Sequence, residues 1–261
     1  MKLHIFSPQG ELALAATMAS RPLLAFDFDG TLAPIVALPD MARMPPGVVS
    51  RLRLLSLRLP VAIVTGREVA DVRKRLDFTP TYIVGSHGAE SDLLDPSPVW
   101  VSAMESAREW LQPFRAELQE LGVQVEDKRS SIALHYRMAR DRERARQRLE
   151  EIMKTAGPAL HVFGGKLVFN IVAARAPDKA DAVHAVVARE GAAAAVFIGD
   201  DINDEPVFQR APAHWLTIKV GRTSWQSRAR FYLDSPLEMA LLLDRMLAQS
   251  GAPPARPAGL Q

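Results

Sequence analysis

Short apolar runs alternate with stretches of helical periodicity along most of the chain. The apolar runs end in polar or glycine-containing loops, which is typical of buried strands, and they lie at 23–28, 61–64, 82–85, 195–198 and 215–220. Amphipathic segments predict helices at 48–57, 68–76, 179–190 and 235–249. Because strands that alternate with helices pair in parallel, the pattern predicts a Rossmann-like α/β core with a parallel sheet.

The periodicity changes in the middle of the chain. There we expect helices at 106–121 and 141–155, antiparallel strands at 123–126 and 131–137, and a hairpin at 159–171 with its turn at Gly164 and Gly165. The first helix is expected despite Pro113. We therefore divide the chain into a core at 1–102 and 173–249, an inserted smaller α+β domain at 103–172, and a disordered tail at 250–261.

Strand alternation gives the inserted domain one apolar face and one polar face. Ile132, Leu134 and Tyr136 fall on one side of their strand, while His135 and Arg137 fall on the other. The two neighbouring strands alternate in the same way, with Glu126, Lys128, Lys166 and Asn170 on the polar side. This face would suit the many hydroxyls of a sugar, and a solvated sheet face is the structural alternative.

Composition excludes several classes of function. The 261 residues are 48% hydrophobic and 24% charged, with a net charge of +2, as in a globular protein. The absence of cysteine excludes disulfides, thiolate metal sites and a cysteine nucleophile. We find no apolar run of about 20 residues and no leader pattern, so we expect a cytoplasmic protein without membrane contact. Scattered arginines with few aromatics do not favour nucleic-acid binding, and we expect a monomer.

Carboxylates follow two of the predicted buried strands. Asp27 and Asp29 end the first strand, and Asp200, Asp201 and Asp204 follow a later one. In open α/β sheets, ligands bind beyond the carboxyl ends of the strands, so these oxygens are expected to meet there. A group of carboxylates requires a cation, and its oxygen ligands suit Mg²⁺.

The same segments offer the groups that phosphoryl transfer needs. Asp27 could attack phosphorus directly, and Asp29 could act as the acid and then the base. Thr65 and Lys179 could stabilise the phosphoryl charge. Each segment alone could instead be a polar turn, a capping turn or a solvated lysine. Their placement after strands or at the start of a helix favours a catalytic site.

These motifs together resemble a known superfamily. The sequence Asp27-Phe28-Asp29-Gly30-Thr31, with Thr65, Lys179 and Gly199-Asp200-Asp201, resembles the haloacid dehalogenase (HAD) superfamily with a large inserted cap. The segments 86–90, 125–128, 135–137, 165–166 and 199–205 are similar to those of trehalose-6-phosphate phosphatases. The resemblance covers about residues 23–220 and implies a magnesium-dependent phosphatase that hydrolyses trehalose 6-phosphate.

The resemblance also implies roles for individual residues. Asp27 would be the nucleophile and Asp29 the acid and base, with Thr65 and Lys179 on the phosphate. Asp200 would bind Mg²⁺ with Asp27 and the Asp29 carbonyl, supported by Asp201 and Asp204, or with the roles of Asp200 and Asp201 exchanged. The expected substrate-binding residues are Gly66, Arg67, His87, Glu90, Glu126, Lys128, His135, Arg137, Lys166 and Asn170. His87 could equally serve the structure of its loop.

Three positions depart from the family pattern. Asn170 stands where a glutamate is usual, Ala180 where glycine is usual, and Asn203 where threonine is usual. The loss of a charged acceptor at Asn170 puts sugar selectivity in question. Two alternatives therefore stay open: a phosphatase of the same superfamily that acts on another sugar phosphate, and a catalytically silent regulator that binds a sugar phosphate.

Overall fold

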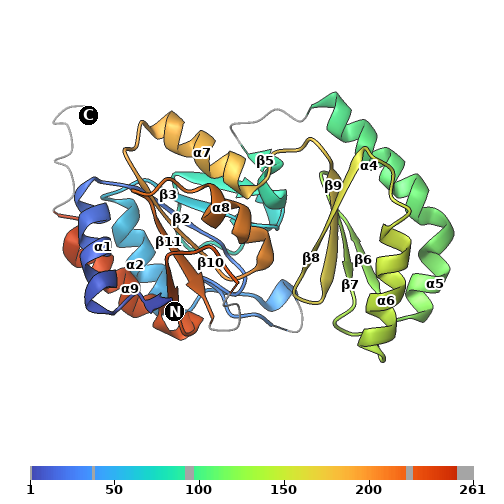
Figure 1. The fold of residues 1–261 in the computed structure, drawn as a ribbon, viewed down its shortest axis with the longest axis horizontal. Coiled ribbons are helices and arrows are strands. Elements are labelled where there is room, and N and C mark those ends of the chain that lie inside the picture. Colours follow the sequence, from blue (N-terminus) through green and yellow to red (C-terminus); the bar gives the residue numbers. More distant parts are fainter. Residues whose placement is uncertain (1, 37–38, 92–96, 222–225, 252–261) are drawn as a thin grey trace.

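The structure is a computed structural model that describes residues 2–36, 39–91, 97–221 and 226–251. It contains two separate sheets, a larger one on the left of Figure 1 and a smaller one on the right. The predicted tail at 250–261 lies outside the described residues from residue 252 onward.

The larger sheet has eight strands and is mainly parallel. Its order is β1-β12-β11-β10-β2-β3-β4-β5, and only β5 runs antiparallel to its neighbour. The strands are β1 (Leu3–His4), β2 (Leu23–Phe26), β3 (Val61–Val64), β4 (Tyr82–Gly85), β5 (Glu90–Ser91), β10 (Ala195–Gly199), β11 (Leu216–Val220) and β12 (Phe231–Leu233). All five strands expected from the apolar runs are present.

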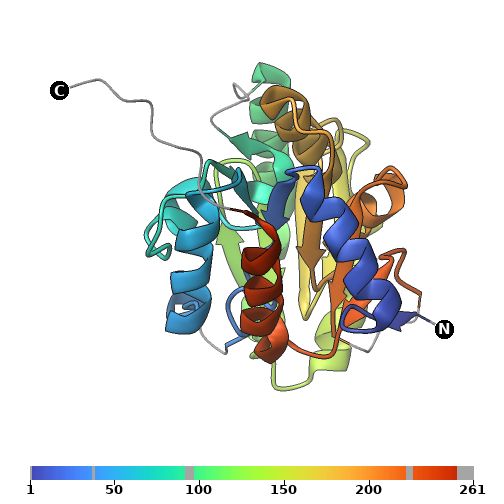
Figure 2. The same ribbon diagram turned by 90° about the vertical axis from the view of Figure 1, so that its left-hand side faces the viewer.

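Helices cover both faces of this sheet. The helices of the core are α1 (Pro8–Ala19), α2 (Pro46–Ser56), α3 (Val69–Arg73), α7 (Lys179–Glu190), α8 (Glu205–Arg210) and α9 (Met239–Gln249). Apolar residues of α1, α2, α3 and α9 pack in one hydrophobic cluster, and those of α7 and α8 pack in a second cluster on the other face. Figure 2 shows α1, α9 and α2 side by side across the first face.

The periodicity did not predict α1, β1 or β12. Two of these elements are strands of two and three residues, too short for an alternating pattern to emerge. Helix α1 carries apolar residues on more than one side, because Leu14 is buried while Leu12 is exposed. Helix α3 ends at Arg73, three residues before the expected end at 76.

The smaller sheet is antiparallel, with the order β6-β7-β9-β8. Its strands are β6 (Gln124–Asp127), β7 (Ile132–His135), β8 (Leu160–Gly165) and β9 (Val168–Ala173), and its helices are α4 (Pro98–Leu111), α5 (Arg115–Glu120) and α6 (Arg142–Met153). Residues of all three helices pack with Ile132, Leu134 and Tyr136 in a third cluster. The predicted apolar face is therefore covered by helices, and the polar face is turned the other way.

Two expectations for this region were wrong in detail. The helix expected at 106–121 starts earlier, at Pro98, and is broken at Gln112–Phe114, because Pro113 has no backbone N–H to donate inside a helix. The hairpin turn lies at Lys166 and Leu167, not at the two glycines. Both glycines belong to β8. A Cβ on Gly165 would lie 3.1 Å from an Asp201 oxygen, so the glycine lets the end of β8 lie close to the loop that follows β10.

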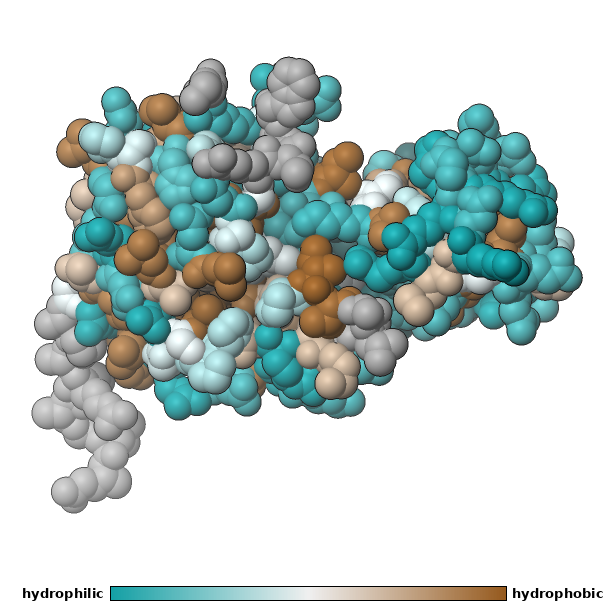
Figure 3. Space-filling model, turned by 90° about the horizontal axis from the view of Figure 1, so that it is seen from below, coloured by the Kyte–Doolittle hydropathy of each residue, from teal (hydrophilic) through white to brown (hydrophobic). Residues whose placement is uncertain are grey.

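The surface is mixed in polarity. Seen from below, the lobe built on the smaller sheet is mainly hydrophilic, and apolar residues on the larger lobe are scattered (Figure 3). Across the described ranges, no helix has both the length and the apolar composition needed to cross a bilayer.

Candidate active site

The polar loops of three neighbouring strands meet at one edge of the larger sheet. Strand β2 lies between β10 and β3, with Phe26 paired to both Ile198 and Ile63. All three strands are parallel, so the residues that follow them, Asp27, Asp200 and Thr65, emerge at the same edge. The sequence-based prediction that these distant segments converge is confirmed.

A buried lysine holds two carboxylates at this edge. The Lys179 ammonium, at the first residue of α7, donates to Asp27 Oδ1 and to Asp204 Oδ1, both at 2.7 Å. All three side chains are buried. Burial alone would lower the pKa of Lys179, but the two carboxylates raise it, so the lysine stays a fixed positive charge.

Asp27, Asp200 and Asp204 form a compact group of oxygens. One carboxylate oxygen from each lies within 4.8 Å of the others, and all three residues are buried. Burial raises the pKa of Asp27 well above its usual value; Lys179 opposes this shift, and Asp204 and Asp200 add to it. Burial also raises the pKa of Asp200. Bringing such groups together in ionised form calls for a hard cation, and three carboxylate oxygens suit one.

Asp201 has a different position from its neighbours. Its carboxylate accepts from the backbone N–H of Ile202 at 2.8 Å and is not part of the compact group. Its own N–H donates to Asp204 Oδ2 at 2.9 Å, so it helps to fold the loop. As a candidate metal ligand, Asp200 therefore fits the geometry better than Asp201. Asp204 also belongs to the compact group, although the sequence had indicated only a supporting role for it.

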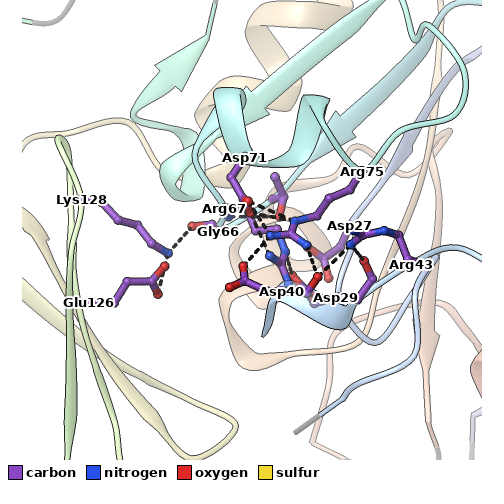
Figure 4. Close-up of polar contacts among 12 residues, drawn as sticks. Asp27, Asp29, Asp40, Arg43, Gly66, Arg67, Asp71, Arg75, Glu126 and Lys128 are labelled. Carbon is purple, nitrogen blue, oxygen red and sulfur yellow. Dashed lines mark hydrogen bonds and ion pairs between the residues drawn. The ribbon is translucent and has the colours of Figure 1, made fainter. Parts of the chain in front are cut away.

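Asp29 is paired with an arginine. Arg67 donates to both Asp29 oxygens, from Nε at 2.6 Å and from Nη2 at 2.7 Å, while its Nη1 donates to Asp71 at 2.8 Å (Figure 4). Burial alone would lower the pKa of Arg67, but Asp29 and Asp71 raise it. Arg67 was predicted to bind substrate, and here its guanidinium contacts two carboxylates instead.

A cavity of about 180 Å³ separates the two sheets. Fourteen of the predicted site residues line it: Asp27, Asp29, Thr65, Gly66, Arg67, His87, Glu126, Lys128, His135, Arg137, Lys166, Asn170, Asp200 and Asp201. The predicted residues Lys179, Asp204 and Glu90 are not among the lining side chains. The polar face of the smaller sheet therefore faces the carboxylates across the cavity.

The wall formed by the smaller sheet carries its own ion pairs. Glu126 accepts from His135 at 2.9 Å and lies 3.2 Å from the Lys128 ammonium. Burial alone would raise the pKa of Glu126, but His135 and Lys128 lower it to about 2. This wall presents a carboxylate, an imidazole and an ammonium group to a ligand.

Two hairpin tips of the smaller sheet reach the larger one. Lys128 donates to the Gly66 carbonyl at 3.4 Å, and the Arg129 N–H donates to Glu68 at 3.0 Å. At the other hairpin, Lys166 pairs with Asp200. The second contact places a cationic side chain directly on the carboxylate group.

His87 is tightly packed beside the cavity. Its backbone has φ 59°, and its ring lies edge-on to Phe163 of β8. A Cβ on Gly66 would lie only 2.4 Å from this ring, so any side chain at position 66 would force the ring to move. Burial lowers the pKa of His87 to about 3, with Lys179 and Lys128 adding to the shift. The imidazole is therefore neutral at ordinary pH.

Glu90 has a supporting position. Its carboxylate accepts from the Val69 N–H and from the Ser86 hydroxyl, both at 3.1 Å. These contacts tie α3 to the loop that carries His87. The geometry therefore gives Glu90 a role in holding this loop.

The sequence reading missed several residues of the site. Ile35 and Val36 add an apolar edge to the cavity, and Asp71 and Arg75 extend the ion pair of Arg67. The only signal in the sequence was the i, i+4 spacing of Asp71 with Arg67 and Arg75, which is common on exposed helices.

Curated relatives and a family profile match most of the chain. The profile of the family described as Trehalose-phosphatase matches residues 25–236. The trehalose-phosphate phosphatase of Mycobacterium tuberculosis is 34% identical over 257 residues, covering 92% of this chain and 64% of that protein. The one from Mycobacterium leprae is 35% identical over 256 residues, covering 88% and 58%. The chain thus spans less than two thirds of the length of these relatives.

Solved structures are similar in fold. The C-terminal domain of trehalose-6-phosphate phosphatase from Candida albicans has a TM-score of 0.79 at 20% identity, covering 95% of this chain and 98% of that one. Trehalose-6-phosphate phosphatase from Aspergillus fumigatus has a TM-score of 0.60 at 24% identity, covering 91% and 97%. The predicted α/β fold, with a parallel core sheet and a smaller α+β unit, is confirmed. Because the family profile covers more than half of the sequence, the chain belongs to the trehalose-phosphatase family.

Proposed function

We propose that this chain hydrolyses trehalose 6-phosphate to trehalose and phosphate through a phosphoryl group carried on Asp27. The observation that carries the proposal is the cavity itself, where a buried carboxylate group and a sheet face rich in hydrogen-bonding groups lie opposite each other. The names of the mycobacterial relatives support the choice of substrate.

The first half-reaction transfers the phosphoryl group to the protein. A carboxylate oxygen of Asp27 attacks phosphorus, and the bond from phosphorus to the sugar oxygen breaks. Asp29, which lines the same cavity, gives its proton to the departing oxygen, so trehalose leaves as a neutral alcohol. Lys179 and the Thr65 hydroxyl are placed to stabilise the charge on the phosphoryl oxygens.

The second half-reaction restores Asp27. Asp29 takes a proton from a water molecule, whose oxygen attacks phosphorus, and the bond from phosphorus to Asp27 breaks. Inorganic phosphate leaves, and each proton given in the first step is recovered in the second. One carboxylate thus serves both steps, as acid and then as base.

The carboxylate group fits the Mg²⁺ that the family implies. Asp27, Asp200 and Asp204 offer three buried oxygens of the kind that Mg²⁺ prefers, and we propose that they hold it, with Asp201 shaping the loop and the Asp29 carbonyl as a further ligand. A bound Mg²⁺ would neutralise charge on the carboxylates and on the phosphoryl group. Lys166, paired with Asp200, would have to move to admit it.

We propose that residues 103–172 act as a cap that recognises the sugar. Glu126, Lys128, His135, Arg137, Lys166 and Asn170 line the cavity on this side and can bind hydroxyls. A site built to hydrogen-bond a ligand rejects analogues that leave its polar groups unpaired. Asn170, which is buried, contributes a neutral amide here.

The test is phosphate release from a panel of substrates, with Mg²⁺ and with a chelator. We expect release from trehalose 6-phosphate to be much faster than from glucose 6-phosphate, sucrose 6-phosphate or mannosyl phosphoglycerate, and to stop with the chelator. Faster release from another member of the panel would favour the alternative sugar phosphatase. Tight binding of trehalose 6-phosphate without any phosphate release would favour the silent regulator.

A further inference from the structure

A series of ion pairs leads away from Asp29 along one side of α3 to Asp40 at the surface. Arg67 joins Asp29 to Asp71, and Asp71 in turn accepts from Arg75, at 3.0 Å from Nε and 2.6 Å from Nη2. Arg75 also donates to Asp40, to its carbonyl at 2.8 Å and its carboxylate at 2.9 Å. Figure 4 shows these side chains close together. Asp71 lies on α3, Arg67 and Arg75 lie just before and just after it, and Asp40 lies in the Pro39–Met41 turn.

The geometry fixes Arg67 from both sides. Its Nε and Nη2 form a two-point contact with Asp29, and its remaining Nη1 is directed at Asp71. The guanidinium also lies 5.6 Å from the centre of the Phe28 ring. Because the guanidinium is planar and rigid, a partner that fixes Nη1 also fixes the two nitrogens that hold Asp29.

The two arginines of this series are more buried than the arginine of an ordinary surface ion pair. The Arg67 and Arg75 side chains are 10% and 7% exposed, against 30% for Arg51 in its surface pair with Asp244. The carboxylates Asp29, Asp71 and Asp40 are 39%, 35% and 95% exposed, so the buried charges of the series are its arginines. A buried charge left without its partner is costly, so loss of one member forces the others to rearrange. Such a rearrangement would reach Asp29, which lines the cavity.

We propose that Asp71 and Arg75 are positioning residues that act through Arg67 to hold the Asp29 carboxylate where it can exchange a proton with the departing oxygen. This inference rests on the proposed function, in which Asp29 is the acid. Neither residue lines the cavity, so neither is expected to contact the substrate.

A substrate whose leaving group needs no proton can distinguish a misplaced Asp29 from a general loss of activity. When a sugar oxygen departs, it must receive a proton, whereas 4-nitrophenolate is stable without one. Misplacement of Asp29 should therefore slow the first turnover of trehalose 6-phosphate and spare that of 4-nitrophenyl phosphate. A general loss of folding or of phosphate binding would slow both substrates together.

The experiment measures the first-turnover release of trehalose and of 4-nitrophenolate by rapid quench with Mg²⁺ present. For Asp71→Asn we expect a fall of about 10-fold with trehalose 6-phosphate and less than about 2-fold with 4-nitrophenyl phosphate, with the KM for trehalose 6-phosphate unchanged. Arg75→Lys keeps the positive charge but loses the planar guanidinium that donates to two partners, so we expect the same difference between the two substrates. The matched control is Asp244→Asn, which removes a two-point arginine pair away from the cavity and should change neither rate.

Equal losses on both substrates, no loss on either, or a higher KM with an unchanged first turnover would overturn the inference. If Asp71→Asn is not folded by circular dichroism, Arg75→Lys decides the question by the same criteria. Failure of the proposed function looks different, because the unaltered protein would then release no trehalose at all.

Discussion

The two walls of the cavity are built on different principles. On the side of the larger sheet, the charged groups are buried and bonded to one another, as in Lys179 between Asp27 and Asp204. On the side of the smaller sheet, Asn170 and Lys128 are largely buried, but Glu126 and Lys166 are each 47% exposed at their side chains. A fixed, buried array suits the stabilisation of charge in a reaction, and an accessible array suits the binding of hydroxyls. The difference suggests that the first wall sets the rate and the second sets the selectivity.

The largest effect on rate is expected from a substitution of the proposed nucleophile, Asp27. Asp27→Asn keeps the size of the side chain and replaces the carboxylate with a neutral amide, whose oxygen is a poor nucleophile, so kcat with trehalose 6-phosphate should fall on the order of 10⁴-fold. Lys179 keeps its contact with Asp204, so circular dichroism and urea unfolding should show a folded protein. A variant that keeps full phosphate release would end the covalent mechanism.

A substitution of the buried Lys179 shows how strongly the stability of the first wall depends on pairing its carboxylates with a positive charge. Lys179→Met should leave Asp27 and Asp204 close together without a cation and lower the free energy of unfolding by about 3–5 kcal/mol. Urea unfolding without Mg²⁺ measures this loss. Lys219→Met is the control, because Lys219 is also buried but donates to the Asp201 carbonyl, and its loss should cost less. Equal losses would contradict the special place given to Lys179.

On the second wall, substitutions should change binding more than rate. Arg137→Ala removes a guanidinium that lines the cavity, so we expect KM for trehalose 6-phosphate to rise about 10-fold with kcat nearly unchanged. Steady-state kinetics measure the two constants separately. Arg140→Ala, at an exposed arginine of the same lobe that is not among the cavity-lining residues, should change neither constant. A fall in kcat alone for Arg137→Ala would contradict the division of roles.

The last prediction concerns His87, which lies at the boundary between the two walls. Burial lowers the pKa of His87 to about 3 from its usual 6.5, so the unfolded chain binds more protons between these values. The contribution of His87 is fully present above pH 6.5 and should be lost as pH falls toward 3, by at most about 1.4 kcal/mol per pH unit. Urea unfolding of His87→Gln across this window should show a shallower loss than the unaltered protein. Identical pH slopes would show that His87 is not buried in its neutral form.

Much of the fold could be predicted because its signals are local. The apolar runs give the central strands, and helix α7 begins at Lys179 and ends at Glu190 as expected. The alternation over residues 131–137 placed His135 and Arg137 on one polar face, and both line the cavity, although Arg137 lies beyond the end of β7. The short strands β1 and β12 were missed because two or three residues are too few to show an alternating pattern.

The sequence predicted most of the residues that meet at the candidate site, but few of the contacts between them. The carboxylates that follow β2 and β10 had to emerge at one edge, since parallel strands share a direction. The sequence could not show that Arg67 turns to Asp29, that Glu90 holds a loop, or that Lys166 reaches Asp200. These contacts depend on how the two sheets face each other, which no local pattern encodes.

The central claim is best tested by trapping the phosphoryl group on the protein. Trehalose 6-phosphate is mixed with the protein and Mg²⁺, the reaction is quenched in acid within the first turnover, and the peptides are examined by mass spectrometry. The account predicts a phosphoryl group on the peptide that contains Asp27, and none in Asp27→Asn. Release of phosphate through the first turnover with no phosphorylated peptide at any quench time would contradict it.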